Sequence, residues 1–191
     1  MKLVFASGNK NKLKEIQQIV GNQFEIISLN ELNFKEDIPE PYETLEENAL
    51  HKAQFIANKF KVNCFAEDTG LLVEALNGAP GVYTARYAGD EKNADNNMSK
   101  LLVALKDKNN RAAKFKTVIA LILEGEAHTF TGEALGVIAE TKSGVAGFGY
   151  DPVFIPSQNS ITFAEMSAID KNKISHRKKA TQKLINFLNK L

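Results

Sequence analysis

The sequence lacks the features that mark several large classes of protein. It contains one cysteine, Cys64, so no disulfide can form within the chain. Because this residue lies in an apolar run, we interpret it as a small buried side chain in a reducing compartment. No apolar run approaches the roughly 20 residues that a helix needs to cross a bilayer. The N-terminus shows no signal-peptide pattern, so we expect a cytoplasmic protein without a membrane partner.

An excess of charge of one sign is also missing. The chain has 24 Lys and Arg residues and 23 Asp and Glu residues, which gives a formal net charge of +1. Proteins that bind nucleic acid through bulk charge usually carry a strong basic excess, so we expect no nucleic-acid partner. An RNA-binding protein is the alternative that salt-dependent RNA binding would reveal. The three histidines have no metal-ligand spacing, which argues against a zinc site.

What the sequence does contain is an alternation of strand-like and helix-like segments. Short apolar runs predict strands at 2–6, 24–28, 62–66, 113–123 and 127–139. Apolar residues at helical spacing predict helices that begin near residues 13, 44 and 98, and another near the C-terminus. Thr44 and Glu47 have the spacing of a capping box. With no repeat, low-complexity tract or linker, the pattern favours one compact α/β domain over residues 1–191.

The segment ASGNKNKLKEI gathers hydrogen-bond donors where an expected strand turns into a helix. Unpaired backbone amides and the positive end of the helix dipole bind anions at such a place. Ser7, Asn9 and Asn11 add side-chain donors. Lys10 and Lys12 add charge that suits a polyphosphate, although the spacing of a Walker loop is absent. A tight turn with an asparagine cap and solvated lysines is the structural alternative.

Two adjacent carboxylates, Glu67 and Asp68, follow the apolar run 62–66. Open α/β sheets collect ligand-binding groups at the ends of strands, and a carboxylate there could bind Mg²⁺ or take a proton from water. The structural alternative is a cap in which Asp68 or Thr69 satisfies backbone donors. More carboxylates lie in the proline-bearing loop before Thr44, where solvated surface is the simpler interpretation.

Two later segments add aromatic faces and hydrogen-bond donors. In GFGYDP, Phe148 and Tyr150 stand among glycines and offer rings on which a base could stack. A β-turn with a core aromatic explains that pattern too. In DKNKISHRKKA, the donors are Lys171, His176 and Arg177, and arginine stays charged at any working pH. A basic helix start with a capping serine is the structural alternative there.

A phosphate cradle, a carboxylate metal site, an aromatic platform and a donor cluster are together what a Mg²⁺-dependent nucleoside triphosphate enzyme requires. The chain resembles the inosine triphosphate pyrophosphatase family, which hydrolyses non-canonical purine nucleotides. The resemblance runs nearly end to end and rests on FASGNKNKLKEI, ENALHKA, AEDTGLLVEALNGAPGVYTARYAG, GFGYDPVF, FAEM and KNKISHRKKA. It implies cleavage of ITP, dITP and XTP to the nucleoside monophosphate and pyrophosphate. It also implies a homodimer and a two-lobed α/β domain, with a central mixed β-sheet flanked by helices and an active-site cleft between the lobes.

The resemblance further implies which residues form the site. The expected substrate-binding residues are Ser7, Gly8, Asn9, Lys10, Asn11, Lys12, Lys52, Thr69, Phe148, Gly149, Tyr150, Asp151, Lys171, His176 and Arg177. The expected catalytic residues are Asp68, Glu67 and Lys12. The expected Mg²⁺ ligands are Asp68 and Glu40, with Asp37 or Glu43 as alternatives to Glu40. A pyrophosphatase for other nucleotides, including modified pyrimidines, and a nucleotide-binding module without catalysis are alternative functions.

Overall fold

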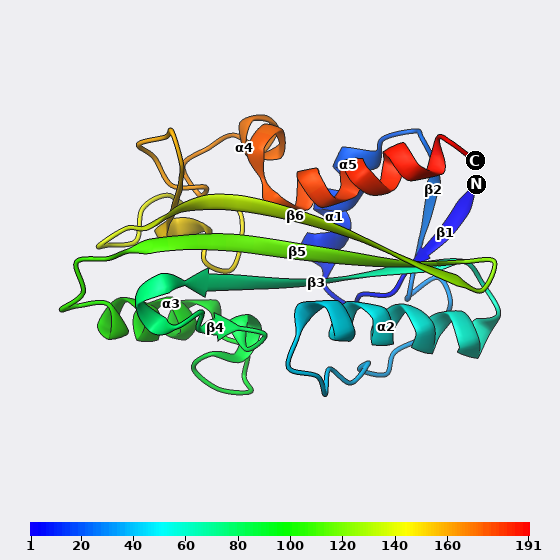
Figure 1. The fold of residues 1–191 in the computed structure, drawn as a ribbon, viewed down its shortest axis with the longest axis horizontal. Coiled ribbons are helices and arrows are strands. Elements are labelled where there is room, and N and C mark those ends of the chain that lie inside the picture. The colour runs from blue at the N-terminus through cyan, green and yellow to red at the C-terminus, as the bar shows by residue number, and fades with distance from the viewer. The chain divides into compact units, whose positions relative to one another are not determined.

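A seven-stranded mixed sheet organises the computed structural model, which describes all residues, 1–191 (Figure 1). The strands are β1 (Lys2–Phe5), β2 (Glu25–Ser28), β3 (Cys64–Val73), β4 (Pro80–Gly81), β5 (Ala112–Leu123), β6 (Glu126–Ile138) and β7 (Phe154–Pro156). Their order in the sheet is β2-β1-β3-β5-β6-β7, with β4 paired to β3. β1 is parallel to β2 and β3, whereas β4 and β7 are antiparallel to their partners. The expected α/β class with a central mixed sheet is therefore confirmed.

Five α-helices complete the fold. They are α1 (Lys10–Val20), α2 (Leu45–Phe60), α3 (Ala94–Ala104), α4 (Ala168–Ile174) and α5 (His176–Leu188). The predicted cap of α2 is present, since Thr44 Oγ1 accepts a hydrogen bond from the Glu47 amide at 3.2 Å and donates one to the Glu47 carboxylate at 2.6 Å. None of these helices combines the length and the apolar character that crossing a membrane requires.

The chain forms two compact units. Unit 1 consists of Met1–Asp68, Thr117–Gly132 and Arg177–Leu191. Unit 2 consists of Thr69–Lys116 and Glu133–His176. The strands β3, β5 and β6 contribute residues to both units. A single domain over residues 1–191 and a cleft between lobes stay predictions.

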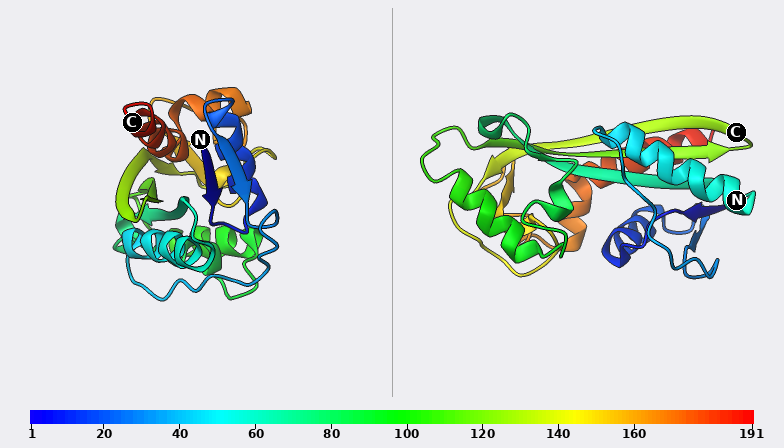
Figure 2. Two further views of the ribbon diagram at one scale, coloured as in Figure 1. Left: turned by 90° about the vertical axis from the view of Figure 1, so that its right-hand side faces the viewer. Right: turned by 90° about the horizontal axis from the view of Figure 1, so that it is seen from below.

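The core of unit 1 packs α1 and α5 against one face of its strands. Phe5 of β1 stacks on Phe65 of β3 with ring centroids 4.9 Å apart, and Ile16 of α1 and Leu184 of α5 belong to the same buried cluster. α2 lies on the other side of these strands from α5 (Figure 1 and Figure 2, left). Cys64 is buried as expected, and burial raises the pKa of its thiol to about 12. The two faces of β3 in unit 1 therefore meet different helices.

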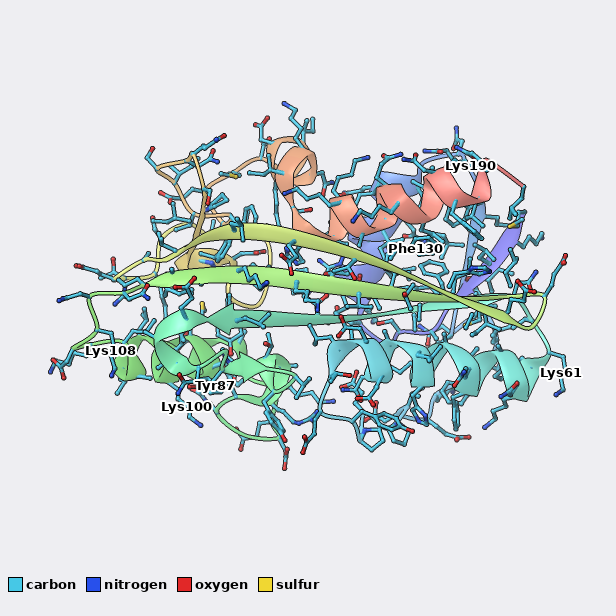
Figure 3. The ribbon with its side chains drawn as sticks, viewed as in Figure 1. Lys61, Tyr87, Lys100, Lys108, Phe130 and Lys190 are labelled. Carbon is cyan, nitrogen blue, oxygen red and sulfur yellow. The ribbon has the colours of Figure 1, made fainter.

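The core of unit 2 is built around aromatic rings. Phe115 of β5 lies 4.7 Å from Phe154 of β7 between ring centroids, and Leu101 of α3 joins the same cluster. On the outer side of α3, the Lys100 ammonium lies 4.6 Å from the centre of the Tyr87 ring (Figure 3). These contacts join β5, β7 and α3 in the core of unit 2.

One strand, β3, is longer than the sequence pattern predicts. The strand expected to end at residue 66 continues as β3 to Val73, so Glu67 and Asp68 lie inside a strand and not after it. Their charges are compatible with a buried strand because each has an oppositely charged partner. β6 runs without a break through Gly132 and Gly136. At Gly136 a Cβ atom would clash with the β7 backbone, so close strand packing explains that glycine.

Candidate active site

Asn9 shapes the loop between β1 and α1. As the N-cap of α1, its Oδ1 accepts hydrogen bonds from the amides of Asn11 at 3.0 Å and Lys12 at 3.1 Å. The asparagine cap proposed as the structural alternative is therefore present. This cap uses two of the amides at the helix N-terminus and fixes the direction in which α1 begins.

Other amides of the loop are left for an external acceptor. The Asn9 amide donates to Ser7 Oγ at 3.2 Å, whereas the amides of Gly8 and Lys10 form no hydrogen bond within the protein. The space around Gly8 is open, because an added Cβ atom would meet nothing within 4 Å. Capping and anion binding can thus occur together at this helix end.

Lys52 of α2 connects two of the predicted carboxylates. Its ammonium donates a hydrogen bond to Glu40 Oε1 and another, 3.0 Å long, to Asp68 Oδ1. Asp37 and Glu43 are exposed. Of the three candidate carboxylates in the proline-bearing loop, the structure therefore brings Glu40 to the cation that also binds Asp68.

Burial and charge act in opposite directions on this group. Burial would lower the pKa of Lys52, but the charges of Asp68 and Glu40, together with their hydrogen bonds, raise it above the ordinary value. Burial raises the pKa of the Asp68 carboxyl, and the charges of Lys52 and Lys12 offset this only in part. Lys52 is thus a permanent cation, and Asp68 is a more basic carboxylate than usual, which suits the acceptance of a proton from water.

Glu67 has a different set of partners, although it is the neighbour of Asp68 on β3. Its fully buried carboxylate accepts hydrogen bonds from Arg177 Nε and Nη2, each at 2.8 Å, and lies 3.2 Å from the Lys12 ammonium. Burial would raise the pKa of the Glu67 carboxyl, but the charges of Arg177 and Lys12 lower it well below its usual value. Glu67 therefore stays ionised at neutral pH.

The same network includes Glu15, a residue that the sequence reasoning missed. Arg177 Nη1 donates to Glu15 Oε2. The available signal was spacing on α1, because Glu15 follows Lys12 by three residues and so shares its face of the helix. Arg177, one of the expected substrate-binding residues, has its guanidinium buried on these two carboxylates.

In unit 2, Asp151 fixes the GFGYDP loop. Its Oδ2 accepts a hydrogen bond from the Phe148 amide at 2.8 Å and one from the Lys171 ammonium at 2.6 Å. The Lys171 ammonium also lies 5.3 Å from the centre of the Phe148 ring. Gly147 has a φ of +75°, and a Cβ atom there would clash with the Asp151 carboxylate. The predicted loop residues are therefore held together by one buried carboxylate.

The two aromatic residues of this loop have different surroundings. Phe148 is half-buried, whereas Tyr150 belongs to the core cluster and donates its hydroxyl hydrogen bond to Thr84 O at 2.9 Å. The core aromatic of the structural alternative is thus Tyr150. His176 is also buried and stacks on Phe115, with ring centroids 4.5 Å apart and planes inclined by 18°. Phe148 is therefore the more exposed of the two rings in this loop.

The predicted site residues fall into two groups, one in each unit. Those of unit 1 are Ser7, Gly8, Asn9, Lys10, Asn11, Lys12, Glu40, Lys52, Glu67, Asp68 and Arg177. Those of unit 2 are Thr69, Phe148, Gly149, Tyr150, Asp151, Lys171 and His176. Asp68 and Thr69 are consecutive in the chain, as are His176 and Arg177, so each group is directly continuous with the other along the backbone.

Known proteins resemble this chain over its whole length. The model of the Ham1 family matches residues 3–187. A dITP/XTP pyrophosphatase of Flavobacterium johnsoniae is 56% identical over 188 residues, which cover 98% of each chain. The solved structure of the Staphylococcus aureus Ham1 protein is 38% identical with a TM-score of 0.90, covering 100% of this chain and 99% of its own. A HAM1 protein from Coxiella burnetii is 36% identical with a TM-score of 0.92, covering 100% of both chains.

Proposed function

Because the chain belongs to the Ham1 family, we propose that it is a Mg²⁺-dependent nucleoside-triphosphate pyrophosphatase. Its substrates are ITP, dITP and XTP, and its products are the nucleoside monophosphate and pyrophosphate. The name dITP/XTP pyrophosphatase, carried by relatives that are 56% and 52% identical, supports this substrate class. The resemblance also leads us to propose a homodimer that acts in the cytoplasm and removes non-canonical purines from the nucleotide pool.

The observation that carries the proposal is the buried group of charges around Lys52. Lys52 and Asp68 are almost completely buried, and Glu40 reaches them from a loop. Taking charged side chains out of water costs several kcal/mol for each ion, so such groups are poor devices for stability alone. Buried charges with perturbed pKa values gather at functional sites. This buried group of charges therefore supports a catalytic role for Asp68 and its charged partners.

The residues present fit a magnesium ion. Carboxylate oxygens are the ligands that Mg²⁺ prefers, and the ion usually binds one or two of them together with substrate phosphates and water. Glu40 and Asp68 match that pattern, since both carboxylates reach the Lys52 ammonium and so lie near each other. When bound, Mg²⁺ would supply charge neutralisation for the triphosphate.

The chain's own residues then account for the hydrolysis. The amides of Gly8 and Lys10 and the Lys12 ammonium bind phosphate oxygens at the start of α1. Asp68 takes a proton from a water molecule while the oxygen of that water bonds to the α-phosphorus. The bond between the α-phosphorus and the oxygen that bridges it to the β-phosphorus breaks, and its electron pair leaves with pyrophosphate. Lys12 and Lys52 stabilise the negative charge that develops on these oxygens.

Unit 2 supplies contacts to the base in this proposal. The half-buried ring of Phe148 provides a stacking face, and Lys171 and His176 provide donors. Hypoxanthine and xanthine have a 6-oxo acceptor where adenine has an amino donor. A buried donor left unpaired costs about 1–3 kcal/mol, which is roughly a 5- to 150-fold discrimination against adenine. Guanine shares the 6-oxo group, so its exclusion requires other contacts.

The position of bond cleavage tests the reaction directly. We expect hydrolysis of ITP in ¹⁸O-labelled water to place one labelled oxygen in inosine monophosphate and none in pyrophosphate, because water attacks the α-phosphorus. Mass spectrometry of the two products measures this label. Formation of inosine diphosphate and inorganic phosphate would contradict the proposal, as would label in the pyrophosphate.

A further inference from the structure

We infer that Glu67 is a positioning residue that holds Lys12 and Arg177 in place and is neither the Mg²⁺ ligand nor the base of the reaction. This inference rests on the proposed function, because it assigns roles within the same site. The sequence gives no basis for separating Glu67 from Asp68, since both are acidic neighbours in one segment. The structure separates them by face, by partners and by access.

Glu67 and Asp68 lie on opposite faces of β3. Successive side chains of a β-strand point to opposite faces, so Glu67 and Asp68 of β3 cannot point the same way. Their contacts agree with this rule. Asp68 contacts Lys52 of α2, whereas Glu67 contacts Lys12 of α1 and Arg177 of α5. α2 and α5 lie on opposite sides of the strands of unit 1 (Figure 1).

Both oxygens of the Glu67 carboxylate already have cationic partners. Oε1 accepts from Arg177 Nη2 and lies 3.2 Å from the Lys12 ammonium, and Oε2 accepts from Arg177 Nε. The side chain is 0% exposed. A metal ion or a reacting water at this carboxylate would have to displace a bidentate guanidinium, which is the tightest of the common partners of a carboxylate. Asp68 pairs with Lys52, and its side chain is 10% exposed.

The ion pair with Glu67 orders the side chain of Lys12. A lysine side chain is flexible, and ordering it costs conformational entropy that binding must otherwise supply. Glu67 holds the Lys12 ammonium near the start of α1, and the charge of Lys12 also acts on the Asp68 carboxyl. Arg177 in turn is fixed by two carboxylates, Glu67 and Glu15. Lys12 is thereby pre-organised for a phosphate before the substrate arrives.

The test compares Glu67→Gln with Lys12→Met and with the double variant. We expect Glu67→Gln to raise the KM for ITP by about tenfold or more, as expected for the loss of a charge-assisted contact. In the Lys12→Met background the same substitution should raise KM no further, because the residue that Glu67 positions is gone. Calorimetric titration of Mg²⁺ into the free enzyme should give the same affinity for Glu67→Gln as for the wild type.

Three outcomes would overturn the inference: additive effects in the double variant, a kcat loss without a change in KM, or a weakened Mg²⁺ affinity in Glu67→Gln. Should Glu67→Gln fail to fold, Glu67→Asp, which keeps the charge but withdraws it from Lys12, replaces it in every measurement. A failure of the proposed function is distinguishable, because the wild type itself would then release no pyrophosphate from ITP.

Discussion

Asp68→Asn should lower kcat for ITP by roughly 10²- to 10⁴-fold, the range expected when a general base is removed. The amide cannot accept the proton of the attacking water, and it is a weaker ligand than a carboxylate for Mg²⁺. The fold should survive, because Lys52 keeps Glu40 as a charged partner. Steady-state pyrophosphate release measures the rate, and near-ultraviolet circular dichroism checks the fold.

Asp90→Asn is the matched control for this variant. Asp90 lies in an exposed loop of unit 2, so the same chemical change there should leave kcat within about twofold of the wild type, as for other surface substitutions. An Asp68→Asn enzyme with near-wild-type kcat would show that Asp68 is neither the base nor an essential ligand.

Arg177→Met should lower the free energy of unfolding by about 3–5 kcal/mol. The guanidinium is fully buried and pairs with Glu67 and Glu15, so its removal leaves buried carboxylates with too few partners. Urea denaturation followed by circular dichroism measures the difference. Lys173→Met is the control, since Lys173 makes an exposed pair with Asp170 and should contribute less than about 1 kcal/mol. Equal effects of the two substitutions would contradict the account.

The stability difference caused by Arg177→Met should depend on pH. The pKa of Glu67 in the folded wild type is lowered from its model-compound value of 4.5, so its contribution is present above that pH and is lost as the pH falls further. In the variant the main cause of this lowering is gone. The difference in the free energy of unfolding between wild type and variant should therefore be largest near neutral pH and should become smaller below pH 4.5. A gap that widened in acid would contradict the assignment of the Glu67–Arg177 pair.

Local features of the fold follow from the sequence because their causes are local. The cap at Thr44 depends on a residue three positions away, and the cap at Asn9 depends on the next two or three amides. The α/β class follows from periodicity and the order of segments. These signals need no knowledge of where distant parts of the chain lie.

The roles of the charged residues depend instead on distant partners. Arg177 is 110 residues from Glu67 and 162 from Glu15, and no local pattern specifies those pairs. Glu67 and Asp68 point to opposite faces because β3 continues past residue 66. The sequence does not indicate this continuation, because two adjacent acidic residues do not fit the apolar pattern of a buried strand. Tyr150 illustrates the same limit, because a tyrosine in a glycine-containing loop segment of the sequence is a core residue in the structure.

The central claim is that this chain selectively hydrolyses non-canonical purine triphosphates. The most direct test is Mg²⁺-dependent pyrophosphate release from ITP, dITP, XTP, ATP, GTP, TTP and UTP under identical conditions. We predict fast release from the first three, with kcat/KM for ATP lower by at least about fivefold, since each unpaired donor contributes a factor of at least about that size. Absence of release from every nucleotide, or equal release from the common ones, would contradict the account.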